Sequence, residues 1–173
     1  MAHYLQVLAD KTGALISTAA RMGVMFSGAP AKFADPVTEY GERIGVAFQL
    51  IDDVIDLSPK AEQTGKQAGT DLRAGVVTLP LLLLRERAES GDSAASDLLR
   101  RIDEGVARIA EGEDPSLLDP EVEALRDHDV TRETELTARR WADDAVEAID
   151  VLPRSAVKRG LERLAESIVS REG

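Results

Sequence analysis

The chain has 173 residues, with 32 acidic and 21 basic side chains and no cysteine. This length suits one domain with a real core, and the lack of cysteine excludes a disulfide framework and predicts a reducing, cytoplasmic location. The formal net charge of −11 argues against a nucleic-acid partner. The longest apolar run, from Leu79 to Leu84, is too short to span a bilayer.

Apolar residues recur at three- and four-residue steps along most of the chain, which predicts amphipathic helices. We expect these helices over residues 3–27, 36–56, 79–89, 92–110, 131–150 and 154–170. Asp35 is expected to cap the second helix, with Pro36 at its first position, and Thr78 to cap the third. Residues 58–77 and 112–120 lack the period and predict loops. Strand signals are nearly absent, so the pattern predicts an all-α fold.

The most informative segment is Phe48–Leu57, where carboxylates stand among apolar residues at the end of the second expected helix. Polar residues at i, i+3, i+4 and i+7 share one face of that helix: Gln49, Asp52, Asp53 and Asp56. The like-charged pair Asp52 and Asp56 costs about 0.2–0.5 kcal/mol, which a bound cation would relieve. Carboxylate oxygens suit Mg²⁺, which bridges readily to phosphates. The pattern predicts a magnesium–phosphate site, and the alternative is a solvated acidic helix end.

A metal–phosphate site also needs basic side chains. Lys11 lies beside the apolar stripe of the first expected helix, and the alternative is a lysine that only extends its charge into solvent. Lys66 stands between glycines and is therefore free to reach a phosphate, the alternative being a flexible polar linker. Lys60 and Arg73 lack such surroundings, so we expect them to be ordinary solvated charges.

Four segments in this order and spacing resemble motifs of the trans-isoprenyl (polyprenyl) diphosphate synthases: Lys11–Leu15, Phe48–Asp56, Gly65–Leu72 and Thr78–Pro80. The second of them looks like the second aspartate-rich motif of that family. The resemblance implies a class I isoprenoid-synthase bundle of helices around a cavity, usually a homodimer. It further implies a Mg²⁺-dependent prenyltransferase that joins isopentenyl diphosphate to an allylic prenyl diphosphate.

The resemblance also implies a role for each matching residue. Asp52 and Asp56 would hold Mg²⁺, with Asp53 supporting them as a third metal-site carboxylate. Lys11 and Lys66 would bind the allylic diphosphate. The side-chain oxygens of Thr12 and Gln49 would face the developing allylic cation. Lys11, Thr12 and Gln49 would thereby be both catalytic and substrate-binding.

Two departures from the family pattern limit this expectation. The first aspartate-rich motif has no counterpart, and Val76 stands where many members carry lysine. We therefore expect residues 1–173 to be the C-terminal part of one synthase domain, incomplete and with little activity alone. In it, residues 1–90 would hold the active-site helices and loop, and residues 91–173 the C-terminal helices.

Three alternatives for the whole protein remain open at this point. The missing part of the site would come from an N-terminal half or from a partner subunit. The chain would otherwise be a non-catalytic interaction module of a heteromeric synthase. A terpene cyclase is a third possibility, although the late metal motif that it requires is not found.

Overall fold

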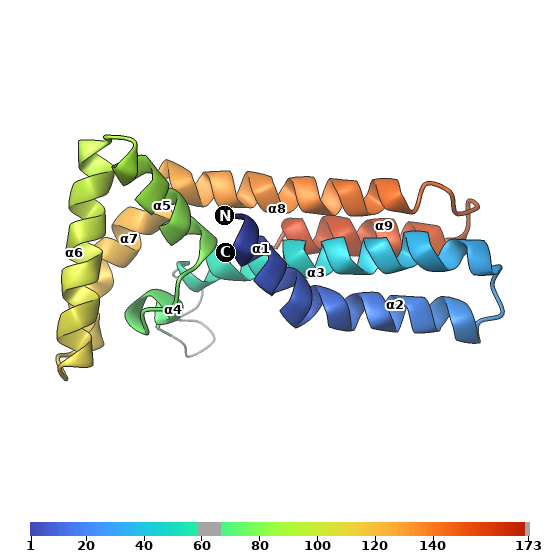
Figure 1. Cartoon of the computed structure of the whole chain (residues 1–173), viewed down its shortest axis with the longest axis horizontal. Helices are drawn as coiled ribbons and strands as arrows, with labels where there is room; N and C mark the ends of the chain where they lie inside the picture. The colour runs from blue at the N-terminus through green and yellow to red at the C-terminus, as the bar shows by residue number, and fades with distance from the viewer. Residues whose placement is uncertain (59–66, 172–173) are drawn as a thin grey trace. The chain divides into compact units, whose positions relative to one another are not determined.

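The computed structural model describes residues 1–58 and 67–171, and every regular element in these ranges is helical (Figure 1). The α-helices are α1 (Ala2–Leu8), α2 (Ala14–Phe26), α3 (Ala34–Asp56), α4 (Thr70–Arg73), α5 (Leu79–Glu89), α6 (Ser93–Ala110), α7 (Asp119–Asp127), α8 (Asp129–Ala148) and α9 (Ala156–Val169). Shorter elements of other helical type are the π-helical turn η1 (Ala9–Gly13) and the 3-10 turns η2 (Ala31–Phe33) and η4 (Pro115–Leu118). The all-α prediction is confirmed.

The chain forms two compact units. One unit comprises Met1–Ile51 and Glu135–Glu172, and the other comprises Asp52–Thr134. Helices α3 and α8 each contribute residues to both units. The two units are therefore described separately.

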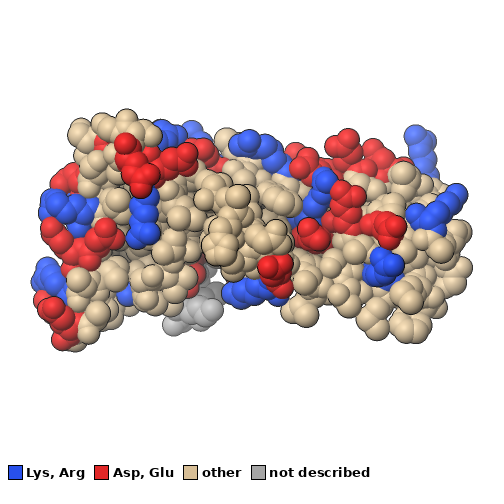
Figure 2. Space-filling view, viewed as in Figure 1, with Lys and Arg blue, Asp and Glu red and all other residues tan. Residues whose placement is uncertain are grey.

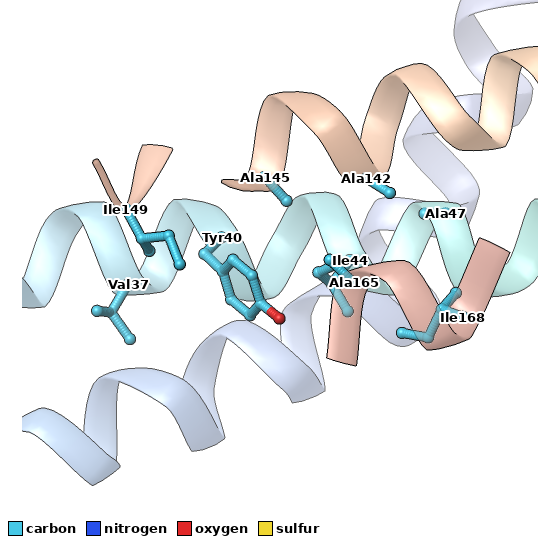
Figure 3. Packing of buried hydrophobic residues seen from close by; sticks show 9 residues of the cluster. All are labelled: Val37, Tyr40, Ile44, Ala47, Ala142, Ala145, Ile149, Ala165 and Ile168. Atoms are coloured by element: carbon cyan, nitrogen blue, oxygen red, sulfur yellow. The ribbon is translucent and has the colours of Figure 1, made fainter. Parts of the chain in front are cut away.

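The first unit has a core of buried side chains from α3, from the second half of α8 and the residue that follows it, and from α9 (Figure 3). Its members are Val37, Tyr40, Ile44, Ala47, Ala142, Ala145, Ile149, Ala165 and Ile168. The members from α8 and α9 include three alanines, Ala142, Ala145 and Ala165. The Tyr40 hydroxyl donates a hydrogen bond to the Leu161 carbonyl oxygen at 2.7 Å, and burial raises the pKa of Tyr40 to about 12.

The second unit is built on the contact between α5 and α6, with η4 and α7 covering α6. Its largest fully buried side chains are leucines and isoleucine from these four elements: Leu79, Leu84, Ile102, Leu118 and Leu125. Helix α6 starts at a strong cap, because the Asp92 carboxylate accepts hydrogen bonds from the amides of Ala94 and Ala95. Both α4 and the start of α5 belong to this unit.

Several predicted boundaries are wrong. Asp35 does not cap the second long helix, because the turn η2 leads directly into α3 at Ala34 and the Asp35 carboxylate instead pairs with Arg21 at 3.0 Å. The predicted loop 112–120 contains η4 and the beginning of α7. Pro115 and Pro120 stand in the first turns of these two elements, where a missing amide hydrogen costs nothing.

Helix α2 exposes a row of large apolar side chains, and few charged atoms cover it at the lower right of Figure 2. The row consists of Leu15, Met22, Met25 and Phe26, the last with 80% of its surface exposed. Spacings of three, four and seven positions place these residues on one side of the helix. In the part of the chain that the structure describes, no helix combines the length and the apolar character needed to cross a membrane.

Candidate functional site

Lys11 and Thr12 lie in η1, the π-helical turn that joins α1 to α2. A single π turn inside a longer helix is rare and frequently accompanies a functional site, because the wider turn changes the direction of its side chains. Lys11 is exposed and Thr12 is half-buried. The predicted first helix is therefore confirmed in extent, but the two residues of interest lie in its one irregular turn.

Two glycines fix the position of this turn against α3. A Cβ atom on Gly45 would lie 2.5 Å from the Gly13 Cα and 2.7 Å from the Gly13 nitrogen, so the two backbones are in direct contact. One turn earlier on α3, Gly41 lies equally close to the backbone of Ser17. The half-buried Gln49 follows Gly45 by one turn of α3. The contact thus places Thr12 beside the segment of α3 that carries Gln49.

The three aspartates of α3 have different surroundings. Asp52 is exposed, whereas Asp53 is buried and its carboxylate accepts a hydrogen bond of 3.1 Å from the Leu79 amide. Leu79 is the first residue of α5, and Thr78, which takes the predicted cap position, makes no side-chain cap hydrogen bond. Asp53 therefore supplies the cap that the sequence assigns to Thr78.

Asp56 is half-buried and holds the segment that leads into α4. Its carboxylate oxygen Oδ2 accepts a hydrogen bond of 3.0 Å from the Asp71 amide, and its carbonyl oxygen accepts one of 2.6 Å from the Gly69 amide. Gly69 has a left-handed backbone with φ of +71°, and a Cβ atom there would lie 2.4 Å from the Val122 side chain. Only glycine fits this turn, which explains the second glycine of the predicted phosphate loop.

The donor set of these aspartates fits a hard divalent cation that keeps part of its water shell. Asp52 and Asp56 stand one turn apart on α3 and offer carboxylate oxygens, the ligands that Mg²⁺ prefers. Asp53 is turned toward the Leu79 amide. Within residues 1–58 and 67–171, no three acidic or histidine side chains form a closed metal-binding group. Asp52 and Asp56 are thus the better suited ligands, and Asp53 suits a supporting role.

The predictions for the basic residues of the second unit can be compared with the structure only in part. Lys66 and Lys60 lie outside the described residues. Arg73, expected to be a solvated charge, is buried with 8% of its surface exposed, and its guanidinium pairs with the Asp119 carboxylate at 2.7 Å. The expectation for Arg73 is wrong because its partner stands 46 positions later in the chain. The one local signal was its place beside the apolar Leu72, which is also buried.

Comparison with known proteins gives a consistent result. The family described as polyprenyl synthetase matches residues 1–112. The chain is 34% identical over 170 residues to nonaprenyl diphosphate synthase of Mycobacterium tuberculosis, covering 98% of this chain and 48% of that protein. It is 30% identical over 169 residues to heptaprenyl diphosphate synthase component 2 of Geobacillus stearothermophilus, covering 98% of this chain and 49% of that protein.

A solved structure shares the fold. The polyprenyl synthase of Caulobacter crescentus, crystallised with calcium and isoprenyl diphosphate, superposes with a TM-score of 0.83 and 29% identity. The match covers all of this chain and 50% of that one. The chain thus spans about half the length of the relatives that it matches.

Proposed function

Because the chain belongs to the polyprenyl synthetase family, we propose that it forms one wall of the prenyl diphosphate site of a trans-prenyltransferase. The complete enzyme would join isopentenyl diphosphate to an allylic diphosphate, acting in the cytoplasm as the cysteine-free composition suggests. Residues 1–173 would be part of a single synthase domain.

The observation that carries this proposal is the arrangement of polar residues at the end of α3. Gln49, Asp52 and Asp56 follow one another at intervals of three and four residues on a continuous helix, and so share one side of it. The Asp52 carboxylate is exposed and therefore accessible to an ion. The Asp56 carboxylate is held in a fixed direction by its hydrogen bond from the Asp71 amide. This arrangement supports a role for Asp52 and Asp56 as ligands of Mg²⁺, with Asp53 anchoring α5 next to them.

The chain's own residues would act on the leaving group and on the cation. When bound, Mg²⁺ would neutralise charge on the diphosphate oxygens. Lys11 and Lys66 would hold the same diphosphate as point charges while the bond between the allylic carbon and oxygen breaks. The electron pair of that bond leaves with the diphosphate, and an allylic cation remains.

The cation would then be consumed by carbon–carbon bond formation. The double bond of isopentenyl diphosphate attacks the allylic carbon, and loss of a proton from the new cation restores a double bond. The side-chain oxygens of Thr12 and Gln49 would stabilise positive charge during this step. Exclusion of water from the site keeps the cation from reacting with it.

The remaining ligands and the isopentenyl diphosphate site would come from further polypeptide, as an N-terminal half or a partner subunit. The exposed apolar row on α2 supports packing against such polypeptide, because a surface of this kind is usually covered. The complete synthase would be a homodimer. The relative described as component 2 of heptaprenyl diphosphate synthase favours a second candidate, a subunit that works only with a different chain.

A calorimetric titration tests the proposed half-site directly. Inorganic pyrophosphate should bind the purified chain in the presence of Mg²⁺ and lose most of its affinity when the metal is omitted or when Asp52 is replaced by asparagine. Binding that is indifferent to both changes would refute the proposal. A variant at the exposed Arg108, which pairs with Glu113, serves as the control and should bind normally.

Turnover separates the half-site from a complete enzyme and from a cyclase. With Mg²⁺, isopentenyl diphosphate and an allylic primer, the chain alone should form little or no longer prenyl diphosphate. Robust elongation would show that the chain needs no further polypeptide to complete the active site. Cyclic hydrocarbon products from the primer alone would instead support a terpene cyclase.

A further inference from the structure

Arg73 is a buried cation whose hydrogen bonds reach three separate backbone or side-chain groups. Its Nε atom donates to the Ala68 carbonyl oxygen at 2.9 Å, and its Nη2 atom donates to Asp119 Oδ1 at 2.7 Å. Its Nη1 atom donates to the Pro115 carbonyl oxygen. A buried guanidinium persists only where its donors are matched. Here the acceptors lie just before α4, in η4 and at the start of α7.

The segment that Arg73 holds cannot keep its shape by itself. Helix α4 has only four residues, and a single helical turn is unstable in isolation. Inside it the Arg73 amide donates to the Gly69 carbonyl oxygen at 2.9 Å, while the side chain closes back on Ala68. The bonds to Pro115 and Asp119 then tie this turn to η4 and α7, which pack against each other and against α6.

The same turn also contacts Asp56. The Gly69 amide bonds to the Asp56 carbonyl oxygen, and the Asp71 amide bonds to the Asp56 carboxylate. Hydrogen bonds of the turn thus join Asp56 to the segment that Arg73 ties to Pro115 and Asp119. A shift of the turn by a fraction of an ångström would change the direction of Asp56 Oδ2 without any direct contact between Arg73 and the site.

We propose that Arg73 is a positioning residue, which fixes the Asp56 carboxylate for metal binding by clamping the turn from Ala68 to Asp71 onto Pro115 and Asp119. The proposal rests on the proposed function, in which Asp56 is a Mg²⁺ ligand. A group that hydrogen-bonds to a metal ligand sets the ligand's orientation, and losing it commonly weakens metal affinity by about 10- to 100-fold. Here that group is the Asp71 amide, on the turn that Arg73 holds.

The test uses the whole chain with Mg²⁺ and inorganic pyrophosphate as the probe. Arg73→Lys keeps a positive charge but cannot reach all three acceptors at once, so Mg²⁺-dependent affinity should fall by about tenfold. Asp119→Asn, which weakens one anchor, should cause a smaller loss of the same kind. Arg108→Ala removes an exposed arginine of the same unit and should change nothing.

A double-mutant cycle distinguishes positioning through Asp56 from general loosening of the fold. In an Asp56→Asn background, Arg73→Lys should cause little further loss, whereas in an Asp52→Asn background it should retain its full effect. Equal losses in the Asp56→Asn and wild-type backgrounds would overturn the proposal. Denaturation curves measured in parallel show whether each variant is folded at the temperature of the titration.

Amide hydrogen exchange keeps the proposal testable if the chain fails to bind pyrophosphate, which would count against the proposed function alone. Arg73→Lys should then speed exchange of the Gly69 and Asp71 amides, with amides in α6 unaffected. Unchanged protection of both amides would show that Arg73 does not hold the turn. The Arg108→Ala protein again provides the reference.

Discussion

Gly13 and Gly45 meet backbone to backbone, so close that a methyl group on Gly45 would lie 2.5 Å from the Gly13 Cα. Gly13 ends the π turn that carries Lys11 and Thr12, and Gly45 lies one turn before Gln49 on α3. The distance between these two glycines therefore sets how close the basic turn can come to the helix with the polar face.

Replacing Gly45 with alanine should separate the π turn from α3. We expect a loss of about 1–3 kcal/mol in the free energy of unfolding, because the added methyl group meets rigid backbone. We also expect weaker Mg²⁺-dependent pyrophosphate binding, since Lys11 and Thr12 move with the turn. Urea denaturation and calorimetry measure the two effects.

Gly23→Ala is the matched control for that experiment. Gly23 also lies within a helix, but a Cβ atom there meets nothing within 4 Å. Its alanine variant should be as stable as wild type or up to about 1 kcal/mol more stable, because alanine is the better helix former. Similar destabilisation of both variants would contradict the role assigned to the Gly13–Gly45 contact.

Substitutions at Asp52 and Asp53 should separate metal binding from helix capping. Asp53→Ala removes the acceptor for the Leu79 amide and should cost about 0.5–2 kcal/mol of stability, whereas Asp53→Asn retains a capping oxygen and should cost less. Asp52→Asn removes an exposed like charge and should leave stability unchanged or raise it by about 0.2–0.5 kcal/mol.

The affinity of the same variants for Mg²⁺ and pyrophosphate then assigns their roles. Asp52→Asn should bind far more weakly, and Asp53→Asn should stay close to wild type. If Asp53→Asn loses as much affinity as Asp52→Asn at full stability, Asp53 is itself a ligand and its supporting role is wrong.

Tyr40 should make stability depend on pH in the alkaline range. Burial raises its pKa from 10.0 to about 12, so the folded chain retains a proton that the unfolded chain releases first. This contribution is complete below pH 10 and declines as the pH approaches 12, by a total of about 2–3 kcal/mol. Denaturation of wild type and Tyr40→Phe at both ends of that range measures it.

The Tyr40→Phe variant separates the effect of Tyr40 on stability from that of lysines, which lose their protons in the same pH range. It loses the hydrogen bond to the Leu161 carbonyl, which should cost about 0.5–1.5 kcal/mol at neutral pH. Above pH 10 its stability should fall less steeply than that of wild type. Parallel curves for the two proteins would contradict the raised pKa.

Val76→Lys should strengthen diphosphate binding. Val76 is exposed, and its amide donates to the Asp71 carbonyl oxygen at 2.8 Å, on the turn that contacts Asp56. A lysine there adds a cation near that turn without disturbing a core, so affinity for Mg²⁺ pyrophosphate should rise about threefold or more, worth roughly 0.7 kcal/mol. Val77→Lys places the charge on the neighbouring exposed residue and provides the comparison.

The sequence alone predicted the features that depend on local spacing. Helical periodicity gave the all-α fold and most of the long helices, because it depends only on residues three and four positions apart. The shared face of Gln49, Asp52, Asp53 and Asp56 was predicted for the same reason, whereas the bond from Asp53 to the Leu79 amide was not. The motifs of the resemblance led to the family that the comparison then confirmed.

Tertiary structure decided the features that join distant parts of the chain. Asp53 caps a helix 26 positions away, and Arg73 pairs with a carboxylate 46 positions away, so neither role was visible in the residues around them. The contact of Gly13 with Gly45 likewise depends on two helices meeting. Hydrogen bonding and close packing are fixed by proximity in space, which local periodicity does not encode.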